Sequence, residues 1–243
     1  MDSSKPNCAV KRSKRAAAES SNCGSMGEVI PKKAVYRLSI YHRCLRKLEE
    51  NGVDTVSSSA LAKAAGVKPS QLRKDFGYLG QFGTRGLGYS VGALMEVIKK
   101  TIGRAKLQPV VLVGVGNLGS ALLRYDGFKK EGFEVVAAFD LDPAQVAERI
   151  ALDIPVLGQD KICEFVSENE IRMAILAVPG PFAQSVANDL VACGVVGILN
   201  FSPVILQVPD GVVVNSVDLA LELEQLSYFV RPPETGEIED DAK

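Results

Sequence analysis

Apolar and polar residues follow two different patterns along the chain, one before about residue 106 and one after it. In 32–51, apolar residues recur every three or four positions among Arg and Lys, which predicts an amphipathic helix ended by Asn51-Gly52. A second helix is predicted over 59–65 after a serine cap, and a third over 70–79 after a short turn. This order is typical of a helix-turn-helix unit, and the segment 91–103 adds an amphipathic helix after it.

Glycines dominate the stretch between the third and fourth predicted helices. Four glycines fall within residues 80–88, which favours a β-hairpin wing over a helix. In a winged helix-turn-helix unit the first residues of the second motif helix face the base edges of the major groove. Gln71 and Arg73 are therefore the expected base readers. The remaining expected contacts are to phosphates from Lys68, Ser70 and Lys74, and to the minor groove from Arg85.

Short apolar strands and amphipathic helices alternate in the second half. The predicted strands are 110–113, 133–139, 155–157, 173–178 and 197–200, and the predicted helices between them are 120–130, 159–167 and 182–193. This alternation predicts an α/β fold with a Rossmann-like, doubly wound parallel sheet, which binds ligands at the carboxyl ends of its strands. A last helix, 217–230, with Asn215 or Ser216 as its cap, is too apolar for one surface face. It packs on its own domain or on a dimer partner.

A glycine-rich turn follows the first of these strands directly. Its G-x-G-x-x-G pattern comprises Gly114, Val115, Gly116, Asn117, Leu118 and Gly119. Such a turn lets a pyrophosphate approach the backbone and lie at the start of the next helix. Asp140 ends the second strand, 21 residues beyond Gly119, where an acid accepts hydrogen bonds from the adenosine ribose and repels a 2′-phosphate. The pattern predicts a site for NADH and NAD+, in preference to NADPH, with Val178, Pro179, Asn200 and Phe201 at strand ends lining it.

Charge separates the same two halves. Residues 1–106 carry 20 of the 28 Lys and Arg residues but only 8 of the 29 Asp and Glu residues, a net of +12 against −13 for the rest. This split favours a polyanion-binding half joined to an acidic half. No apolar run is long enough to span a bilayer and Met1–Met26 is polar, so we expect a cytoplasmic protein with no membrane contact.

The cysteines and the histidine suggest no chemistry of their own. The five cysteines are scattered without a C-x-x-C, which predicts reduced thiols and neither a disulfide framework nor a metal site. A redox-sensing thiol stays open as an alternative. His42, the single histidine, is placed on the helix surface or in an interface, and we expect no catalytic residue.

Several motifs together resemble the Rex-type redox-sensing transcriptional repressors over roughly Ile30 to Val230. The matching segments are Val56–Ser58, Gln71–Phe76, Gly83–Tyr89, Gly114–Gly119, Phe139–Asp142, Gly197–Phe201 and Val217–Ala220. The resemblance implies a homodimer whose C-terminal helices are exchanged. It also implies a repressor that senses the NADH/NAD+ ratio, binds palindromic operator DNA with NAD+ or no ligand, and releases it when NADH closes the dimer. By the same resemblance Tyr125 lies near the nicotinamide and is linked to Arg43 and to the partner subunit's Asp218.

Two other functions remain as alternatives. Tyr125 and Lys129 match the Y-x-x-x-K pattern of an NAD-dependent dehydrogenase, although they lie beside the pyrophosphate site. The acidic half also resembles CoA-ligase nucleotide domains, which leaves a CoA-binding Rossmann protein as a second alternative. The predicted organisation is a disordered basic arm (1–29), a winged-helix domain (30–106), an NAD(H)-binding domain (107–214), a dimerisation helix (215–230) and a disordered tail (231–243). The arm departs from the short N-terminus of the Rex family.

Overall fold

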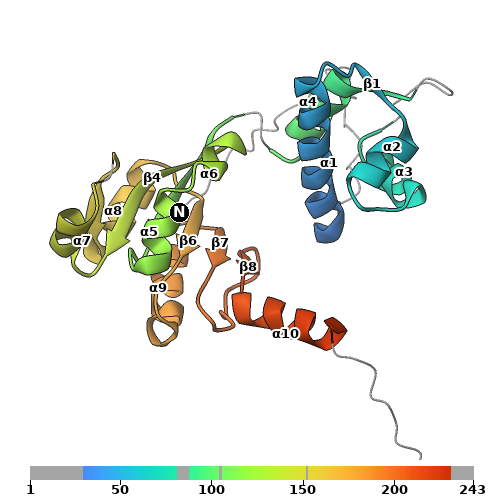
Figure 1. Cartoon of the computed structure of the whole chain (residues 1–243). Helices are drawn as coiled ribbons and strands as arrows, with labels where there is room; N and C mark the ends of the chain where they lie inside the picture. Colours follow the sequence, from blue (N-terminus) through green and yellow to red (C-terminus); the bar gives the residue numbers. More distant parts are fainter. Residues whose placement is uncertain (1–29, 81–87, 104–105, 152, 231–243) are drawn as a thin grey trace, which may run out of the picture. The chain divides into compact units, whose positions relative to one another are not determined.

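The computed structural model describes residues 30–80, 88–103, 106–151 and 153–230 of the 243-residue chain (Figure 1). The chain divides into two compact units, Met1–Ile98 and Lys99–Lys243, which are described separately below. The predicted basic arm, the predicted C-terminal tail and most of the predicted wing, including Arg85, lie outside the described residues.

The N-terminal unit is a small helical domain completed by a two-stranded sheet. Its helices are α1 (Lys32–Glu50), α2 (Ser58–Ala64), α3 (Pro69–Gly77) and α4 (Val91–Thr101), the last of which crosses the boundary between the two units. β1 (Thr55–Val56) pairs antiparallel with β2 (Tyr89–Ser90). Ser57 caps α2 as the sequence predicts, because its side-chain oxygen accepts a hydrogen bond of 3.1 Å from the Ala60 N–H. The unit therefore contains the predicted helix-turn-helix order.

The core of this unit is apolar, with two notable exceptions. Leu38, Leu45, Leu72 and Ile98 are among its fully buried side chains. His42 is also buried, with 8% of its surface exposed, so the prediction of a surface or interface histidine is wrong. His42 lies four residues after Leu38 and three before Leu45, so it falls on the buried face of α1. The second buried polar residue, Asp75, belongs to the candidate site below.

The C-terminal unit is built on a six-stranded parallel sheet. The strand order is β5-β4-β3-β6-β7-β8, and every neighbouring pair is parallel. The strands are β3 (Gln108–Val113), β4 (Phe133–Asp140), β5 (Val156–Gly158), β6 (Met173–Leu176), β7 (Gly197–Asn200) and β8 (Val213–Ser216). This is the strand order of a doubly wound dinucleotide-binding fold, and it confirms the predicted fold class.

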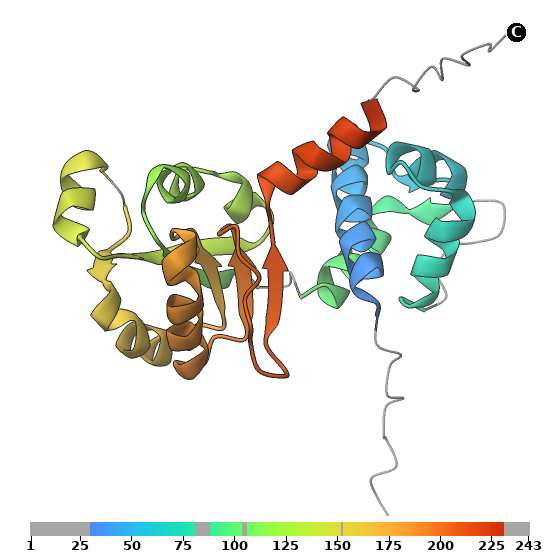
Figure 2. The same ribbon diagram turned by 90° about the horizontal axis from the view of Figure 1, so that it is seen from below.

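Helices cover both faces of this sheet, as Figure 2 shows with the sheet seen nearly edge-on. One side carries α5 (Asn117–Leu123), α6 (Gly127–Lys130) and α7 (Pro143–Arg149), and the other carries α8 (Ile162–Glu168), which follows the 3-10 turn η1 (Gln159–Lys161), and α9 (Gly180–Ala192). The strand residues alternate accordingly. Val110 and Leu112 pack with the α5–α7 layer, and Val111 and Val113 with the α8–α9 layer.

Several details of the secondary structure differ from the sequence prediction, which also lacked α7. The single helix predicted over 120–130 is two helices, because α5 is capped at Arg124 and the chain restarts as α6 after Asp126. Strand β8 was not predicted, and it contains the two residues that the sequence assigned as the cap of the last helix. The cap is Asp218, whose Oδ1 accepts hydrogen bonds from the N–H groups of Ala220 (2.9 Å) and Leu221 (3.3 Å).

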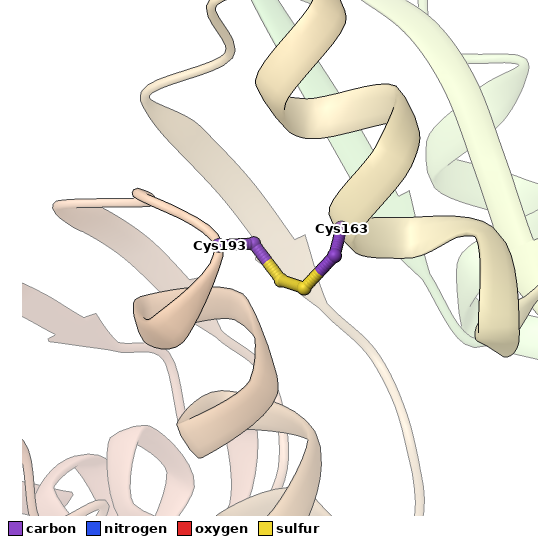
Figure 3. The surroundings of a disulfide bond; sticks show 2 residues. All are labelled: Cys163 and Cys193. Carbon is purple, nitrogen blue, oxygen red and sulfur yellow. A yellow bond between two sulfur atoms is a disulfide. The ribbon is translucent and has the colours of Figure 1, made fainter.

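The prediction of reduced thiols is wrong for two of the five cysteines. Cys163 and Cys193 form a disulfide between α8 and the end of α9 (Figure 3). They are 30 residues apart, so no local spacing signals the pair, and only the packing of α8 against α9 brings them together. Cys44 is free and half-buried, and burial raises the pKa of its thiol, while Cys8 and Cys23 lie outside the described residues.

The last helix, α10 (Leu219–Val230), has no buried residue. Its apolar side chains are 59–75% exposed, and they are Leu219, Leu221, Leu223, Leu226, Tyr228, Phe229 and Val230. Of the two alternatives left open by the sequence, packing on its own domain is therefore not observed. Within the described part of the chain, no helix is long and apolar enough to cross a membrane.

Candidate dinucleotide cleft and DNA-binding helix

A cleft of about 580 Å³ opens at the carboxyl ends of β3 and β6 in the C-terminal unit. These two strands are neighbours in the sheet, and the chain leaves them toward opposite faces. It runs from β3 into α5 and from β6 into α9. Such a switch point leaves an opening between the two connections, and it is where doubly wound sheets bind their ligands. The strand order therefore determines where the cleft lies.

The glycine-rich turn forms one wall of the cleft, and each of its glycines has a separate structural reason. Gly114 has a φ of +95°, and a side chain there would approach the Ala177 carbonyl oxygen to 2.7 Å. A side chain at Gly119 would collide with the Gly114 carbonyl oxygen, so this glycine allows close packing of α5 on the turn. A side chain at Gly116 would meet no protein atom within 4 Å, which leaves room for a ligand against the backbone.

Asp140 connects the turn to the end of β4. Its Oδ2 accepts a hydrogen bond of 2.7 Å from the Val115 N–H, and its Oδ1 accepts one of 3.1 Å from the Asp142 N–H. An ionised carboxylate has about four acceptor positions, so capacity remains for ribose hydroxyls. Arg149 of α7 also reaches this turn, where its guanidinium donates to the Val115 carbonyl oxygen. Asp140 therefore lines the cleft while fixing the turn beside it.

Eight of the predicted nucleotide-binding residues come together in this cleft: Gly114, Gly116, Asn117, Leu118, Asp140, Val178, Pro179 and Phe201. The cleft also has lining residues that sequence reasoning missed, namely Leu141, Gln159, Ala177, Phe182, Ser185, Val186 and Asp189. Leu141 and Phe182 are 76% and 56% exposed, which offers apolar surface suited to a flat aromatic ring. The position of Phe182 after Pro179-Gly180-Pro181 was the signal for it, since the start of α9 faces the same edge of the sheet as the glycine turn.

Four predicted residues are not among those lining the cleft. Val115 and Gly119 are buried within the turn. Asn200 is fully buried, and its amide donates to the carbonyl oxygens of Ser202 (3.1 Å) and Val204 (3.0 Å) while accepting from the Ser202 N–H. It therefore holds the loop that presents Phe201. Tyr125 is 60% exposed and packs edge-on against Phe128, with 5.1 Å between ring centroids.

In the N-terminal unit, four of the six predicted DNA-contacting residues lie exposed on α3 and at its cap. Lys68, Ser70, Arg73 and Lys74 are all exposed. Arg73 Nη1 lies 3.4 Å from the Ser58 hydroxyl, which links the start of α2 to the exposed face of α3. These residues carry three positive charges on one short helix and its cap, a surface that fits a phosphate backbone.

The opposite side of α3 is fixed by Asp75, a carboxylate that is 1% exposed. Arg37 donates to it twice, through Nε at 2.6 Å and Nη2 at 2.7 Å. The Tyr41 hydroxyl (2.8 Å) and the Gln71 amide (2.9 Å) complete the set of donors. We call these four residues the Asp75 cluster. It connects two residues of α1 to two residues of α3, so it sets how the exposed helix stands on the domain.

Hydrogen bonding decides the charge state of this cluster. Burial raises the pKa of Asp75, but the hydrogen bonds from Arg37, Tyr41 and Gln71 outweigh it and hold the pKa below its usual value. The same hydrogen bond raises the pKa of Arg37, and burial raises the pKa of Tyr41. The Asp75 carboxylate is therefore ionised at neutral pH. Gln71, predicted as a base reader, is engaged by this carboxylate, a contact that the sequence did not indicate.

The predicted switch residues lie on three separate elements. Arg43 is exposed on α1, Tyr125 follows α5, and Asp218 precedes α10, which it caps. The described residues contain no cluster of three or more His, Cys, Asp or Glu side chains suited to a metal ion.

Comparison with known proteins also divides the chain into an N-terminal and a C-terminal unit. Residues 29–77 match the family "Putative DNA-binding protein N-terminus", and residues 105–204 match the family "CoA binding domain". The redox-sensing transcriptional repressor Rex of Carboxydothermus hydrogenoformans is 46% identical over 84% of this chain and 98% of its own length. Rex of Streptomyces avermitilis is 48% identical over 82% of this chain and 79% of its own length.

The chain belongs to the Rex family of redox-sensing transcriptional repressors.

Solved structures of Rex-family proteins resemble this chain as well. The crystal structure of RSP in complex with β-NAD+ and operator DNA matches with a TM-score of 0.76 and 34% identity, over 83% of this chain and 93% of that one. RSP in complex with β-NADH matches with a TM-score of 0.72 and 33% identity, over 83% and 94%. The family membership and the observed fold agree with the resemblance detected in the sequence, and the Rex relatives are named as repressors, not as enzymes.

Proposed function

We propose that this Rex-family chain is an NADH/NAD+-responsive repressor. It binds operator DNA when it carries NAD+ or no nucleotide, and it releases the DNA when NADH binds. A single observation carries the proposal: a dinucleotide cleft with a complete glycine turn and ribose acid is joined in one chain to an exposed basic helix of a helix-turn-helix unit. A protein with both surfaces can couple nucleotide binding to DNA binding. The RSP structures provide the precedent, since RSP was solved with NAD+ and operator DNA and with NADH.

The cleft would take the dinucleotide along its length. The pyrophosphate lies over Gly116 and the start of α5, and the ribose hydroxyls bind Asp140, which disfavours NADPH. Leu141 and Phe182 would flank the adenine. Phe201 and Val178 would line the nicotinamide end, where an apolar surface suits the neutral ring of NADH better than the cationic ring of NAD+. Asn200 contributes by holding Phe201, and Val115 and Gly119 by shaping the turn.

Operator recognition would rest on α3. Arg73 is the principal base reader, while Lys68, Ser70 and Lys74 bind phosphates. Arg85 lies outside the described residues, and its proposed place in the minor groove rests on the sequence alone. Gln71 reads bases only if it leaves Asp75, so we assign it first to positioning the helix. DNA binding also implies a cytoplasmic location.

The active form would be a homodimer in which α10 packs on a second copy of the chain. Seven large apolar side chains gathered on one exposed helix are typical of an interaction surface. A two-fold dimer also matches a palindromic operator, because two copies of α3 then read two equivalent half-sites. Tyr125, Arg43 and the partner's Asp218 would change contacts as the dimer closes. NADH shifts the equilibrium only as far as it binds the closed dimer more tightly than the open one.

The alternative functions lack support. The Tyr125–Lys129 pair is not placed for hydride chemistry, since Tyr125 packs on Phe128 and Lys129 pairs with Glu134 at 3.1 Å. The family named "CoA binding domain" covers residues 105–204, but the full-length Rex relatives are redox-sensing repressors.

The test is binding to a library of palindromic duplexes at one fixed salt concentration, with no nucleotide, with NAD+ and with NADH. Salt is fixed because phosphate contacts make affinity steeply salt-dependent. We expect sequence-specific binding that NAD+ leaves intact and NADH abolishes. Absence of specific binding under all three conditions, together with NADH consumption on a carbonyl substrate, would support the dehydrogenase instead.

A further inference from the structure

The disulfide between Cys163 and Cys193 crosslinks α8 to the end of α9. The two Cα atoms are 4.8 Å apart, within the range that a disulfide bridges without backbone movement. Figure 3 shows Cys163 on α8 and Cys193 at the end of α9. Cys163 is exposed and Cys193 is half-buried. The helices also share apolar packing, because Ile162 and Val166 lie in the same core cluster as Leu190.

Each cysteine is four residues from a residue that lines the cleft. Gln159, at the start of η1, precedes Cys163 by one helical turn. Asp189 precedes Cys193 by the same distance on α9, and its carbonyl oxygen accepts a hydrogen bond of 3.0 Å from the Cys193 N–H. The disulfide therefore ties together two separate segments of the cleft wall, the β5–η1 connection and the body of α9.

An operator-binding protein works in the compartment that holds DNA, where thiols are kept largely reduced. A disulfide in such a protein is more often a switch than a permanent staple, and exposure of Cys163 gives oxidants and reductants access. We propose that Cys163 and Cys193 are a reversible thiol–disulfide modification site through which a peroxide-class oxidant acts on the dinucleotide cleft. The effect on the cleft rests on the proposed function, while the thiol chemistry does not.

The chemistry is a balanced two-electron oxidation. The Cys163 thiolate attacks one oxygen of hydrogen peroxide, the O–O bond breaks, and the products are a sulfenic acid and, after protonation, one water. The Cys193 sulfur then attacks the sulfenic sulfur, the S–O bond breaks, and a second water leaves. Two thiols and one peroxide thus give one disulfide and two waters. A dithiol reductant reverses the bond by thiol–disulfide exchange and is itself oxidised.

The position of the bond predicts which part of the ligand is affected. Gln159 follows β5, whose last residue pairs with Asp140, and Asp189 lies on α9, whereas Phe201 follows β7 on the other side of β6. The crosslink therefore preorganises the adenosine end, which NAD+ and NADH share. Oxidation should strengthen binding of both nucleotides by about fivefold, with little change in the ratio of their affinities. Peroxide would then raise nucleotide occupancy without changing what the repressor senses.

The experiment uses the full chain with Cys8, Cys23 and Cys44 replaced by Ser, so that only the proposed pair remains. Peroxide-treated and dithiothreitol-reduced protein are compared by thiol counting, by intact mass and by NAD+ and NADH titration. We expect loss of two thiols on oxidation, recovery of both on reduction of the folded protein, and the parallel change in affinity. The matched control adds Cys163→Ser, whose affinities should be the same before and after peroxide.

Three results would overturn the proposal. They are two thiols that persist after peroxide, a disulfide that cannot be reduced without unfolding the protein, and equal nucleotide affinities in the oxidised and reduced forms. Failure of the proposed function would look different. In that case neither form would bind a dinucleotide, although the thiols would still oxidise and recover.

Discussion

The two units build their candidate binding surfaces in opposite ways. The N-terminal unit presents charged side chains on α3, and the buried Asp75 cluster holds that helix in place. The C-terminal unit presents main-chain groups, and its turn depends on the absence of side chains at Gly114, Gly116 and Gly119. The first surface should therefore be sensitive to removal of charge and the second to addition of atoms.

This contrast reflects the two ligands. A nucleic acid is a long polyanion, so affinity comes from several separated cations, and each can be lost without destroying the rest. A pyrophosphate is compact, and it is bound by N–H groups that must point to one place. Substitutions in one unit should therefore leave the binding surface of the other unit unchanged.

The largest effect is expected from Arg37→Ala. The substitution leaves the buried Asp75 carboxylate without its ion-pair partner, which should destabilise the N-terminal unit by about 3 kcal/mol. Chemical denaturation followed by a probe in each unit would measure it, with operator affinity falling and NADH affinity unchanged. Glu50→Gln is the matched control on the same helix. It breaks an exposed pair with Arg46 and should change stability by less than about 0.5 kcal/mol.

Two glycine substitutions test the claim about added atoms. Gly114→Ala forces a side chain into a backbone conformation at φ +95° and against Ala177, so it should destabilise the C-terminal unit by roughly 2 kcal/mol and abolish NADH binding. Gly116→Ala meets no protein atom and should leave the melting temperature close to that of the wild type. It should nevertheless block the pyrophosphate. Calorimetry and NADH titration distinguish the two variants. Full NADH affinity in Gly116→Ala would show that the pyrophosphate does not bind over Gly116.

Arg73→Ala removes one exposed cation from α3 and should leave the fold intact. Specific operator binding should weaken by about 1–3 kcal/mol, while NADH affinity stays the same. Fluorescence anisotropy with operator and with a scrambled duplex provides the measurement. An equal loss of NADH affinity would show that the two surfaces are not separate.

Asp140→Ala should reduce NADH affinity by roughly tenfold, and it should also reduce the preference of the cleft for NADH over NADPH. The carboxylate accepts the Val115 N–H, so the variant loses part of the turn as well as the ribose contact. Asp140→Asn keeps the shape of the side chain and separates the two contributions. The measurement is titration with NADH and with NADPH. An unchanged ratio of NADH to NADPH affinity in both variants would show that Asp140 does not contact the ribose.

The smallest effect is a pH dependence confined to the N-terminal unit. Because the folded-state pKa of Asp75 is lowered, its contribution to stability is complete above the unfolded-state pKa of about 3.9 and is lost as the pH falls through the folded value. Acid unfolding monitored in each unit should show this component in the wild type. It should be missing in Asp75→Asn, and an identical acid profile in that variant would contradict the assignment.

Local patterns were enough to predict most of the fold. The glycine spacing, the apolar strands and the acid at the end of β4 lie close together in the sequence, so the Rossmann-like unit and eight residues of its cleft could be predicted. The basic helix-turn-helix was predicted from the 3.6-residue periodicity and the charge of 32–79. Strand β8 was missed because Val213–Ser216 is a four-residue segment with two polar residues at its end.

Most of the features that the sequence did not reveal depend on tertiary contacts. Arg37 and Asp75 are 38 residues apart, Cys163 and Cys193 are 30 apart, and Gln159 joins Asp140 in the cleft only after β4 pairs with β5. No local pattern marks such pairs. Burial of His42 is the exception, because its spacing from Leu38 and Leu45 places it on the apolar face of α1 and could have been recognised in the sequence.

The most direct test of the proposed sensing mechanism is whether NADH and operator DNA weaken each other's binding by the same factor. By linkage, if NADH weakens operator binding by a given factor, saturating operator must weaken NADH binding by that factor. NADH affinity would be measured at one salt concentration on the free protein and on the protein saturated with operator duplex. We predict a reduction in NADH affinity that equals the NADH-induced loss of operator affinity. NADH affinity that is the same on free and operator-bound protein would contradict the proposed sensing mechanism.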